Sequence, residues 1–356
     1  MSTLALDNRI MEYAVYGGAV LGGGGGGWIE RGLEIGRLAL EIGEPRLLTI
    51  DEMNDEDLLV TVALVGAPGA KDKFLKPVHY IRALEMLRQR IQKPIQGIIT
   101  NENGAETTVN GWFQSAMTGI PVIDNPCNGR AHPTGLMGAM NISELSDYVS
   151  HQGAVGGKGS RYLEIAVSGN LERSASMIRN ASIEAGGMVA VARNPVTVRY
   201  AKQHGAPGAI KQAIELGEAL LTHKGEAAID AVVNKLDGRV EVVGTVTDFR
   251  METKNGFDVG IVTIDGSFEM TFWNEYMTLE KEGERLATFP DLIMTLDTET
   301  AKPVVSAAIE KGQRLTVISA PKEKLILSTT MSNINLLKPI EIAVEKPIVA
   351  ALDTKL

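Results

Sequence analysis

Six consecutive glycines, Gly22 to Gly27, constrain the fold of this chain more than any other stretch. Glycine has no Cβ, so such a run adopts positive φ angles and brings successive backbone N–H groups close to an anion or a polar ring. Apolar residues at helical spacing precede the run in residues 7–21 and resume at Trp28. The run therefore joins two packed helices, and we expect it to form a ligand cradle. A flexible surface tether is the alternative.

The glycine run does not have the context of a dinucleotide site. A Rossmann fingerprint needs a strand before the glycines and a helix after them. Residues 7–21 instead predict a helix, with Asp7 or Asn8 as its N-cap. A GxGxxG match inside six glycines is automatic and carries almost no information. We expect no dinucleotide here, and the sequence indicates no other cofactor.

Charge and composition narrow the classes of partner. The chain has 356 residues, 44% of them hydrophobic, and a net charge of −9, which is typical of a globular protein with two domains and no nucleic-acid partner. The single cysteine, Cys127, excludes an intramolecular disulfide and a cysteine-based zinc cluster, and fits a reducing compartment. We find neither a signal-peptide pattern nor an apolar run of roughly 20 residues, so we predict a cytoplasmic protein without a membrane partner.

The first two thirds of the chain alternate between strand and helix patterns. Buried apolar runs end in polar loops and lead into amphipathic segments, which predicts an α/β domain over residues 1–237, with a largely parallel sheet and flanking helices. The expected strands are 46–50, 58–65, 95–100, 121–124, 162–168 and 188–192, and the expected helices are 7–21, 28–42, 78–90, 105–117, 171–185 and 209–223.

From Arg239 onward the pattern changes to short alternating segments. Turn signals such as Asn255-Gly256 and Asp265-Gly266 recur at strand-length intervals. This pattern predicts a smaller, mostly antiparallel β domain over residues 238–356. Its edge strands offer a route to a homo-oligomer.

Glu102 directly follows one of the buried strands, in the segment Asn101-Glu102-Asn103-Gly104. In open α/β sheets ligands bind beyond the carboxyl ends of the strands. Glu102 is therefore a candidate general base, metal ligand or acceptor for ligand N–H groups. The alternative is that Glu102 or Asn103 caps the helix expected to begin at Ala105.

Residues 124–133 hold the richest set of reactive groups in the chain. Asp124 can orient or deprotonate a ligand, Arg130 can bind a developing anion, and Cys127 or His132 can act as a nucleophile or base. The structural alternative makes Asp124 a turn residue and places Arg130 in an ion pair. A lone cysteine such as Cys127 is more often a small buried apolar residue than a reactive one.

A third candidate region couples the glycine pair Gly186-Gly187 to a strand that ends in Arg193. It either closes a pocket from the side opposite Glu102 or forms a helix end and a turn. The remaining histidines are scattered and lack the HxH or HxxxH spacing of a metal site, so we expect no metal.

Taken together, these stretches resemble the S-methyl thiohydantoin desulfurase family. The similarity runs from about Asp7 to Ile318 and rests on a set of motifs that are individually weak: LGGGGGG, GAPG, NENGAETT, PVIDNPCNGRAHP, AGGMVAVARNP, FWNEYMTLE, ATFPDLIMTLDTET and GQRLTVI. The resemblance implies an α/β domain followed by a smaller β-rich domain. It also implies hydrolytic removal of sulfur or methanethiol from a five-membered thiohydantoin ring, leaving a hydantoin.

The resemblance also implies positions for the site. The glycine loop of the family falls on Gly22 to Gly27, its acidic strand-end residue on Glu102, and its aspartate with the following Gly-Arg-Ala on Asp124, Gly129 and Arg130. This chain departs from the family pattern at Asn103, where a glycine pair is common, and at His132, where phenylalanine is usual. The candidate substrate-binding residues are Gly23, Gly24, Gly25, Gly26, Asn103 and His132.

The sequence-based hypothesis is that water activated by Glu102 or Asp124 attacks the ring carbon that bears sulfur. Arg130 and the N–H groups of the glycine loop then stabilise the resulting anion. A competing mechanism makes Cys127 a covalent nucleophile. A non-catalytic alternative is a subunit that binds a cyclic amide, or that stands beside a hydantoinase or oxoprolinase partner.

Overall fold

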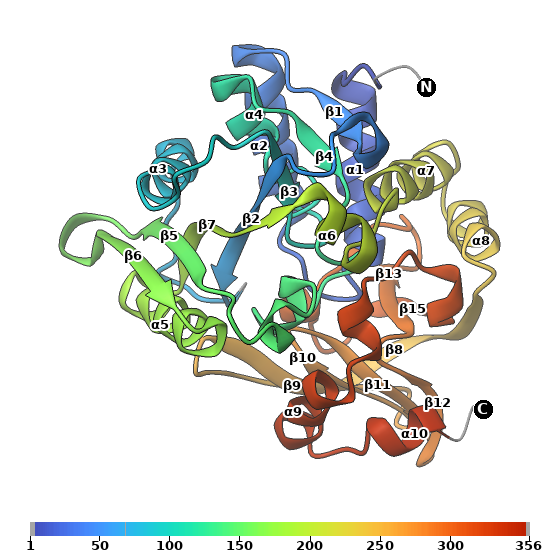
Figure 1. Ribbon diagram of the computed structural model, residues 1–356. Coiled ribbons are helices and arrows are strands. Elements are labelled where there is room, and N and C mark those ends of the chain that lie inside the picture. The colour runs from blue at the N-terminus through green and yellow to red at the C-terminus, as the bar shows by residue number, and fades with distance from the viewer. Residues whose placement is uncertain (1–3, 68, 354–356) are drawn as a thin grey trace.

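The structure is a computed structural model that describes residues 4–67 and 69–353. It contains two β-sheets, one formed by the first part of the chain and one by the second, with helices around and between them (Figure 1). Pro68, in the GAPG turn noted above, lies outside the described residues.

The first sheet has seven strands in the order β1-β4-β3-β2-β7-β5-β6. Strands β1, β4, β3, β2 and β5 run in one direction, and β7 and β6 run in the other. The predicted α/β class with a mostly parallel sheet is thereby confirmed. The strands are Leu47–Thr49 (β1), Leu58–Gly66 (β2), Gly97–Thr100 (β3), Val122–Asp124 (β4), Ser150–Gly156 (β5), Leu163–Gly169 (β6) and Met188–Thr197 (β7).

Helices cover both faces of this sheet because successive strand residues point to opposite sides. In β5, Val155 packs with Leu84 of α3, whereas the adjacent Ala154 packs with Ile178 of α5. The helices of this part are Asn8–Leu21 (α1), Ile29–Ile42 (α2), Pro77–Arg88 (α3), Trp112–Thr118 (α4), Leu171–Glu184 (α5), Val198–His204 (α6), Ala209–Leu221 (α7) and Glu226–Lys235 (α8).

The second sheet has eight strands in the order β12-β11-β10-β9-β8-β15-β13-β14, and every pairing is antiparallel, as the sequence predicts. The long strand β8 joins its two halves by pairing first with β15 and then with β9. The remaining elements are Arg239–Lys254 (β8), Phe257–Ile264 (β9), Phe268–Trp273 (β10), Glu275–Lys281 (β11), Glu284–Thr288 (β12), Leu292–Asp297 (β13), Pro303–Val304 (β14), Arg314–Ala320 (β15), Ile334–Val344 (α9) and Val349–Asp353 (α10).

A shared apolar core joins the two sheets. Helices α1, α7 and α8 pack against β13 and β15, and all five elements contribute fully buried side chains to one cluster. Burial of this kind stabilises by roughly 25 cal/mol per Å² of apolar surface. The shared core therefore fixes the position of one sheet relative to the other. The domain boundary expected near Asp237 stays a prediction.

The helix predicted for residues 105–117 begins only at Trp112. The backbone N–H groups of Glu106 and Thr107 donate to the carbonyl of Gly26, at 2.9 and 3.3 Å, instead of to partners within a helix. Gly111 then adopts φ 104°, which a continuous helix does not allow. The interaction with the glycine run, which lies far away in sequence, overrides the local helical pattern.

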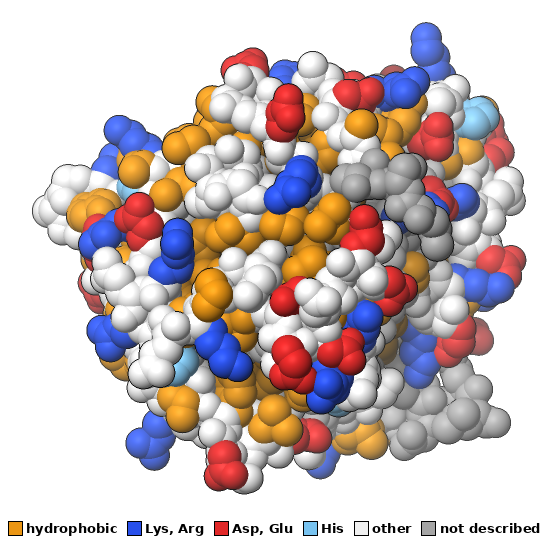
Figure 2. Space-filling view, turned by 45° about the horizontal axis from the view of Figure 1, so that its top comes forward, with side chains coloured by type: hydrophobic (Ala, Val, Ile, Leu, Met, Phe, Trp, Pro, Cys, Tyr) orange, Lys and Arg blue, Asp and Glu red, His pale blue; other side chains and the backbone are white. Residues whose placement is uncertain are grey.

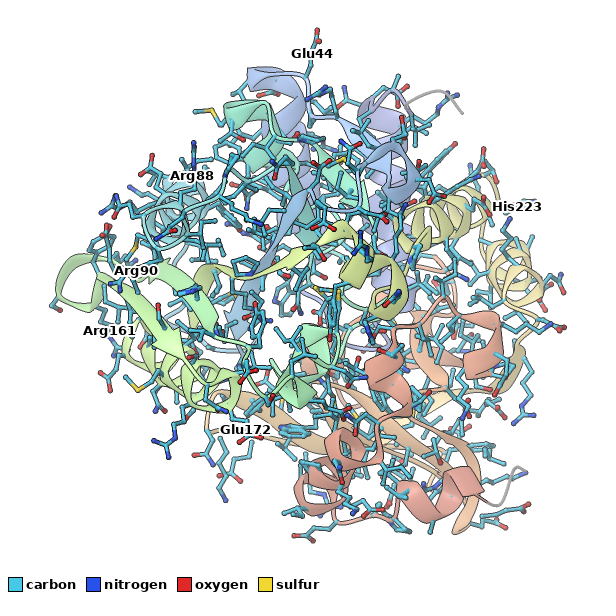
Figure 3. The ribbon with its side chains drawn as sticks, viewed as in Figure 1. Glu44, Arg88, Arg90, Arg161, Glu172 and His223 are labelled. Carbon is cyan, nitrogen blue, oxygen red and sulfur yellow. The ribbon has the colours of Figure 1, made fainter. Side chains whose placement is uncertain are left out.

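The surface carries charges of both signs. On the face in Figure 2, Lys and Arg side chains are interspersed with Asp and Glu, and apolar side chains lie between them. Charged side chains such as Arg88, Arg161 and Glu172 point outward at the periphery (Figure 3). Within residues 4–67 and 69–353, none of the helices has the length and apolar content that a bilayer crossing requires.

Candidate active site between the two sheets

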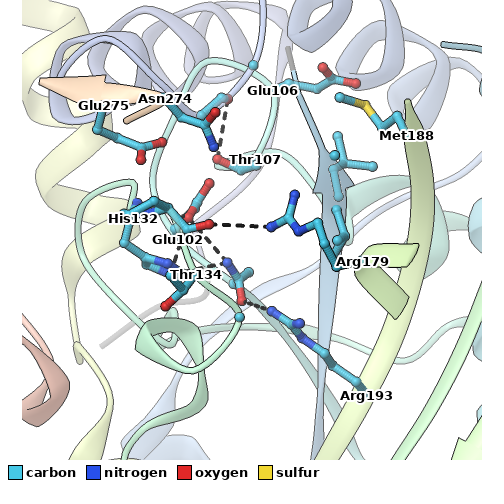
Figure 4. Close-up of a pocket in the computed structure, with 18 residues that line it drawn as sticks. Glu102, Glu106, Thr107, His132, Thr134, Arg179, Met188, Arg193, Asn274 and Glu275 are labelled. Atoms are coloured by element: carbon cyan, nitrogen blue, oxygen red, sulfur yellow. Dashed lines mark hydrogen bonds and ion pairs between the residues drawn. The ribbon is translucent and has the colours of Figure 1, made fainter. Parts of the chain in front are cut away.

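A polar pocket lies where the glycine run, the ends of strands in the first sheet and the start of β11 meet (Figure 4). Its volume of about 50 Å³ admits a small ligand or a few ordered waters, since one water needs roughly 10–15 Å³. Ligand sites commonly occur at such boundaries between structural units. The lining residues are Gly26, Gly27, Leu64, Val65, Gly66, Asn101, Glu102, Glu106, Thr107, His132, Pro133, Thr134, Gly135, Arg179, Met188, Arg193, Asn274 and Glu275.

The glycine run connects the two sheets through its carbonyl groups. The carbonyl of Gly23 accepts a hydrogen bond from the backbone N–H of Tyr276 at 2.8 Å, and that of Gly24 accepts one from Ser306 at 2.9 Å. Both glycines have positive φ angles, 54° and 95°, which non-glycine residues seldom adopt. The first part of the run is thus a structural joint and does not line the pocket.

The last two glycines of the run do line the pocket. In the part of the chain that the structure describes, the N–H groups of Gly26 and Gly27 donate to no acceptor. They are therefore available to a ligand, as the cradle hypothesis expects for Gly26. Gly25 has a different role: a Cβ there would lie 1.9 Å from Oε1 of Glu275, so glycine is needed to seat that carboxyl group.

Glu102 stands at the carboxyl end of β3 and is only 8% exposed. Its Oε2 atom accepts hydrogen bonds from the backbone N–H of His132 and from Nδ2 of Asn101, both at 3.2 Å. These donors converge on Oε2, which leaves Oε1 for a water or a substrate. Loss of water on burial outweighs the donors and raises the pKa of Glu102 to about 8.

A chain of hydrogen bonds links Arg193, Asn101 and Glu102 beside the ring of His132. Nη2 of Arg193 donates to Oδ1 of Asn101 at 2.6 Å, so the Nδ2 group of Asn101 must face Glu102 and His132 as a donor. Nε2 of His132 lies 3.2 Å from Nδ2 of Asn101 and 3.2 Å from Oε2 of Glu102, so it has a partner at this atom in either tautomer, whereas Nδ1 has none among the described residues. Burial lowers the pKa of His132 to about 3, so its ring is neutral.

Glu275 approaches the pocket from the second sheet, at the start of β11. The turn before it is fixed by Asn274, which has φ 59° and exchanges two hydrogen bonds with the backbone of Asp258. Glu275 is 2% exposed, and its Oε2 atom has no hydrogen-bond partner among the described residues. Burial, with the nearby charge of Glu102, raises the pKa of Glu275 well above its usual range.

Arg179 and Arg193 line the pocket without forming an ion pair with a carboxylate in the described part of the chain. Arg179 donates to the carbonyls of Gly256 and Pro133, at 2.9 and 3.4 Å. Nε of Arg193 has no partner among the described residues. Arg193 is buried and Arg179 is partly buried. Because buried cations are normally paired, these two guanidinium groups favour a ligand that carries or develops negative charge.

Arg130 lies beside the pocket, behind the glycine run. Its Nη1 atom donates to the backbone carbonyls of Pro290, at 3.0 Å, and Asp291, and its guanidinium stacks 4.6 Å from the Phe289 ring. A Cβ on Gly23 would lie 2.4 Å from Nη2 of Arg130. Arg130 therefore ties the second sheet to the glycine run and adds positive charge near Glu275.

Two predicted site residues have structural positions away from the pocket. The carboxylate of Asp124 accepts hydrogen bonds from the N–H groups of Ile210 and Lys211, at 2.7 and 3.2 Å, at the start of α7. Nδ2 of Asn103 donates to the carbonyls of Gly129 and Ala209, at 3.2 and 2.7 Å. Neither residue lines the pocket, contrary to the expectation for both, because each satisfies buried backbone groups near α7.

Cys127 also lies outside the pocket lining. It is fully buried, and its Sγ atom is 3.2 Å from Oγ1 of Thr61. Burial raises the pKa of the thiol to about 11, and only the thiolate is a good nucleophile. This arrangement does not suit the proposed role of Cys127 as a covalent nucleophile.

The hypothesis of a carboxylate-activated water predicts that Cys127→Ser releases thiol from a thiohydantoin at a rate within a few-fold of the unmodified protein, because the thiol is buried and protonated. Iodoacetamide should likewise leave activity intact at neutral pH, as measured by the rate of thiol release. Inactivation that Cys127→Ser prevents would restore the cysteine mechanism.

Several lining residues were not identified as site residues from the sequence: Asn101, Glu106, Thr107, Arg179, Asn274 and Glu275. For Glu275 a signal existed, since it stands inside the FWNEYMTLE motif that contributes to the family resemblance. The site role considered for Arg193 matches its position across from Glu102 (Figure 4).

Across the described residues, no three His, Cys, Asp or Glu side chains gather closely enough to hold a metal ion.

Comparisons with known proteins agree with this architecture. A family model described as "S-Me-THD-like, N-terminal domain" matches residues 10–162, and one described as "S-Me-THD-like, C-terminal domain" matches residues 170–339. A crystal structure of a protein from Chromobacterium violaceum has the same fold, with a TM-score of 0.74, 19% sequence identity, and coverage of 98% of this chain and 99% of that one. No protein of curated function matches the chain.

Proposed function

The chain belongs to the S-methyl thiohydantoin desulfurase family, and from this premise we propose that it hydrolyses an S-substituted thiohydantoin to a hydantoin and a thiol. The observation that carries the proposal is Glu102, a buried carboxyl group at a strand end that lines a small polar pocket. A pKa near 8 lets Glu102 both accept and return a proton close to neutral pH.

In the proposed reaction Glu102 takes a proton from water as the water oxygen bonds to the ring carbon that bears sulfur. The pair of electrons from the adjacent C=N bond moves to the ring nitrogen. Oε1 suits this role because Oε2 is held by His132 and Asn101. General base catalysis of this kind contributes about 10²–10⁴-fold to a rate.

The developing anion is stabilised by donors that are already in position. The N–H groups of Gly26 and Gly27 have no acceptor in the described structure, and Arg179 and Arg193 add positive charge to the same pocket. Preorganised donors in a buried site require little rearrangement during the reaction. The neutral ring of His132 keeps Glu102 oriented without adding a charge.

The proposal predicts that the purified protein alone releases methanethiol from S-methyl thiohydantoin and forms one hydantoin for each thiol. A thiol-specific dye follows the first product, and chromatography follows the second. Heat-denatured protein is the control for spontaneous hydrolysis. This protein is assayed without a hydantoinase or oxoprolinase partner. The alternative, a subunit that only binds a cyclic amide, predicts that calorimetry detects binding of the cyclic amide and that no thiol is released. That result would contradict the enzyme proposal.

A further inference from the structure

We propose that Glu275, supplied by the second sheet, is a second catalytic carboxyl group: the general acid that protonates the departing sulfur. This inference rests on the hydrolysis proposed above and assigns one step of it. The side chains of Glu275 and Glu102 both line the same pocket and reach it from different sheets (Figure 4). Glu275 therefore approaches a bound ring from another direction than the water that Glu102 activates.

The two carboxyl groups differ in the hydrogen-bond donors around them, and this difference suits Glu102 as a base and Glu275 as an acid. Oε2 of Glu102 receives two N–H donors, which favour the carboxylate. Oε2 of Glu275 receives none from the described residues, although this residue is only 2% exposed. A shared proton therefore favours Glu275, and the raised pKa of that residue agrees with this assignment.

The position of Glu275 is built into the fold. Gly25 leaves room for the carboxyl group, and a Cβ at that glycine would overlap Oε1. Asn274 fixes the turn immediately before it, and Ser306 donates to the Asn274 carbonyl. Leaving a buried polar atom without a hydrogen bond costs about 1–3 kcal/mol. The buried position of the Glu275 carboxyl group is therefore not explained by stability, and this favours a role in catalysis.

The step balances as follows. Glu102 first carries a proton from water to the ring nitrogen, which gives a neutral tetrahedral adduct with hydroxyl and alkylthio groups on the same carbon. Glu102 then removes the hydroxyl proton as C=O forms and the C–S bond breaks, with its electron pair going to sulfur. Glu275 gives its proton to that sulfur, and the thiol leaves. A proton passes from Glu102 to Glu275 and restores both groups.

Leaving-group ability provides the test. We expect Glu275→Gln to slow hydrolysis of the S-methyl substrate by about 100-fold or more, because methanethiolate leaves poorly without a proton. The S-trifluoroethyl analogue has a more acidic thiol and should lose less than roughly 10-fold. Glu102→Gln should slow both substrates to a similar extent, because water must be activated for either one.

The pH profile gives a second readout. Glu102, Arg130 and Arg179 are the charged groups that face Glu275 from the first part of the chain. The decline of kcat/KM at alkaline pH reports loss of the proton from the acid. Glu275→Gln should remove this decline for the trifluoroethyl substrate, whereas Glu275→Asp should retain it and recover part of the S-methyl activity.

Glu284→Gln is the matched control, since Glu284 is exposed on β12, in the same sheet. Equal losses on both substrates in Glu275→Gln, or unchanged S-methyl turnover, would overturn the acid assignment while leaving the hydrolysis intact. If Glu275→Gln does not fold, as judged by circular dichroism, the same comparison is made with Glu275→Ala, which also removes the acid. An unmodified protein that releases thiol from neither substrate would overturn the proposed function itself.

Discussion

Glu102→Gln is expected to reduce kcat for thiohydantoin hydrolysis by about 10²–10⁴-fold, with KM changed little. The amide keeps the shape of the side chain and can still accept from the N–H of His132 and from Asn101 through its oxygen. It cannot take a proton from water. Steady-state thiol release measures the loss, and binding of the hydantoin product, followed by calorimetry, reports whether the pocket is preserved.

The same substitution should stabilise the protein at alkaline pH. Burial raises the pKa of Glu102 from 4.5 to about 8, so the folded state holds a proton that the unfolded state releases. The contribution of Glu102 to stability is therefore complete below pH 4.5 and is lost as the pH rises to about 8, at up to about 1.4 kcal/mol per pH unit. The Gln variant, which does not ionise, escapes this loss.

Urea denaturation at several pH values checks this expectation. The free energy of unfolding should be similar for the two proteins near pH 4.5, and the variant should be the more stable one by several kcal/mol near pH 8. If the free energies of unfolding of the two proteins changed with pH in parallel over that range, Glu102 would ionise as freely as an exposed carboxylate. Wild-type turnover in the variant would remove Glu102 from the mechanism.

Gly26→Ala is expected to lower the free energy of unfolding by about 2–5 kcal/mol and to abolish turnover. The φ angle of Gly26 is 77°, and a Cβ there would lie 2.4 Å from the Cα atom of Gly104. The left-handed conformation costs roughly 1–2 kcal/mol, and overpacking adds about 1–3 kcal/mol. The clash is with backbone, so no side-chain rotation relieves it, and the loop that carries Glu102 must move.

Gly119→Ala separates these two costs. Gly119 has a similar φ of 73°, but a Cβ there would meet nothing within 4 Å. We expect this control to lose only about 1–2 kcal/mol and to keep its activity, as measured by urea denaturation and thiol release. If both alanine variants were equally stable and active, the close approach of the glycine run to Gly104 would contribute to neither stability nor activity.

Local patterns predicted most of the secondary structure. Helix α1 begins after Asp7, whose side chain accepts from the N–H of Ile10 as an N-cap, and the apolar run at 58–65 is β2. These elements follow from periodicity and capping, which nearby residues determine. Strand β5 was not expected, because Ser150–Gly156 contains two glycines and a single β-branched residue. Pairing with β6 and β7 on both sides makes it a strand.

The site was predicted only in part. Glu102 and His132 share a pocket, as expected for residues that follow the neighbouring parallel strands β3 and β4. Arg193 and the end of the glycine run line it too, but Arg193 lies within β7, which continues to Thr197 instead of ending before this residue. The contact between Asn101 and Arg193 spans 92 residues and has no local signal. Glu275 comes from the other sheet, and no periodicity within either half indicates how the two sheets face each other. The same limit applies to Asp124, whose partners at the start of α7 lie 86 and 87 residues away.

The hydrogen bonds from Tyr276 and Ser306 to the carbonyls of Gly23 and Gly24 fasten the second sheet beside the pocket. A gene truncated to either half would therefore encode only one member of the acid–base pair, without the partner surface that orients it. Fragments of this protein should regain function only when co-expressed and reassembled.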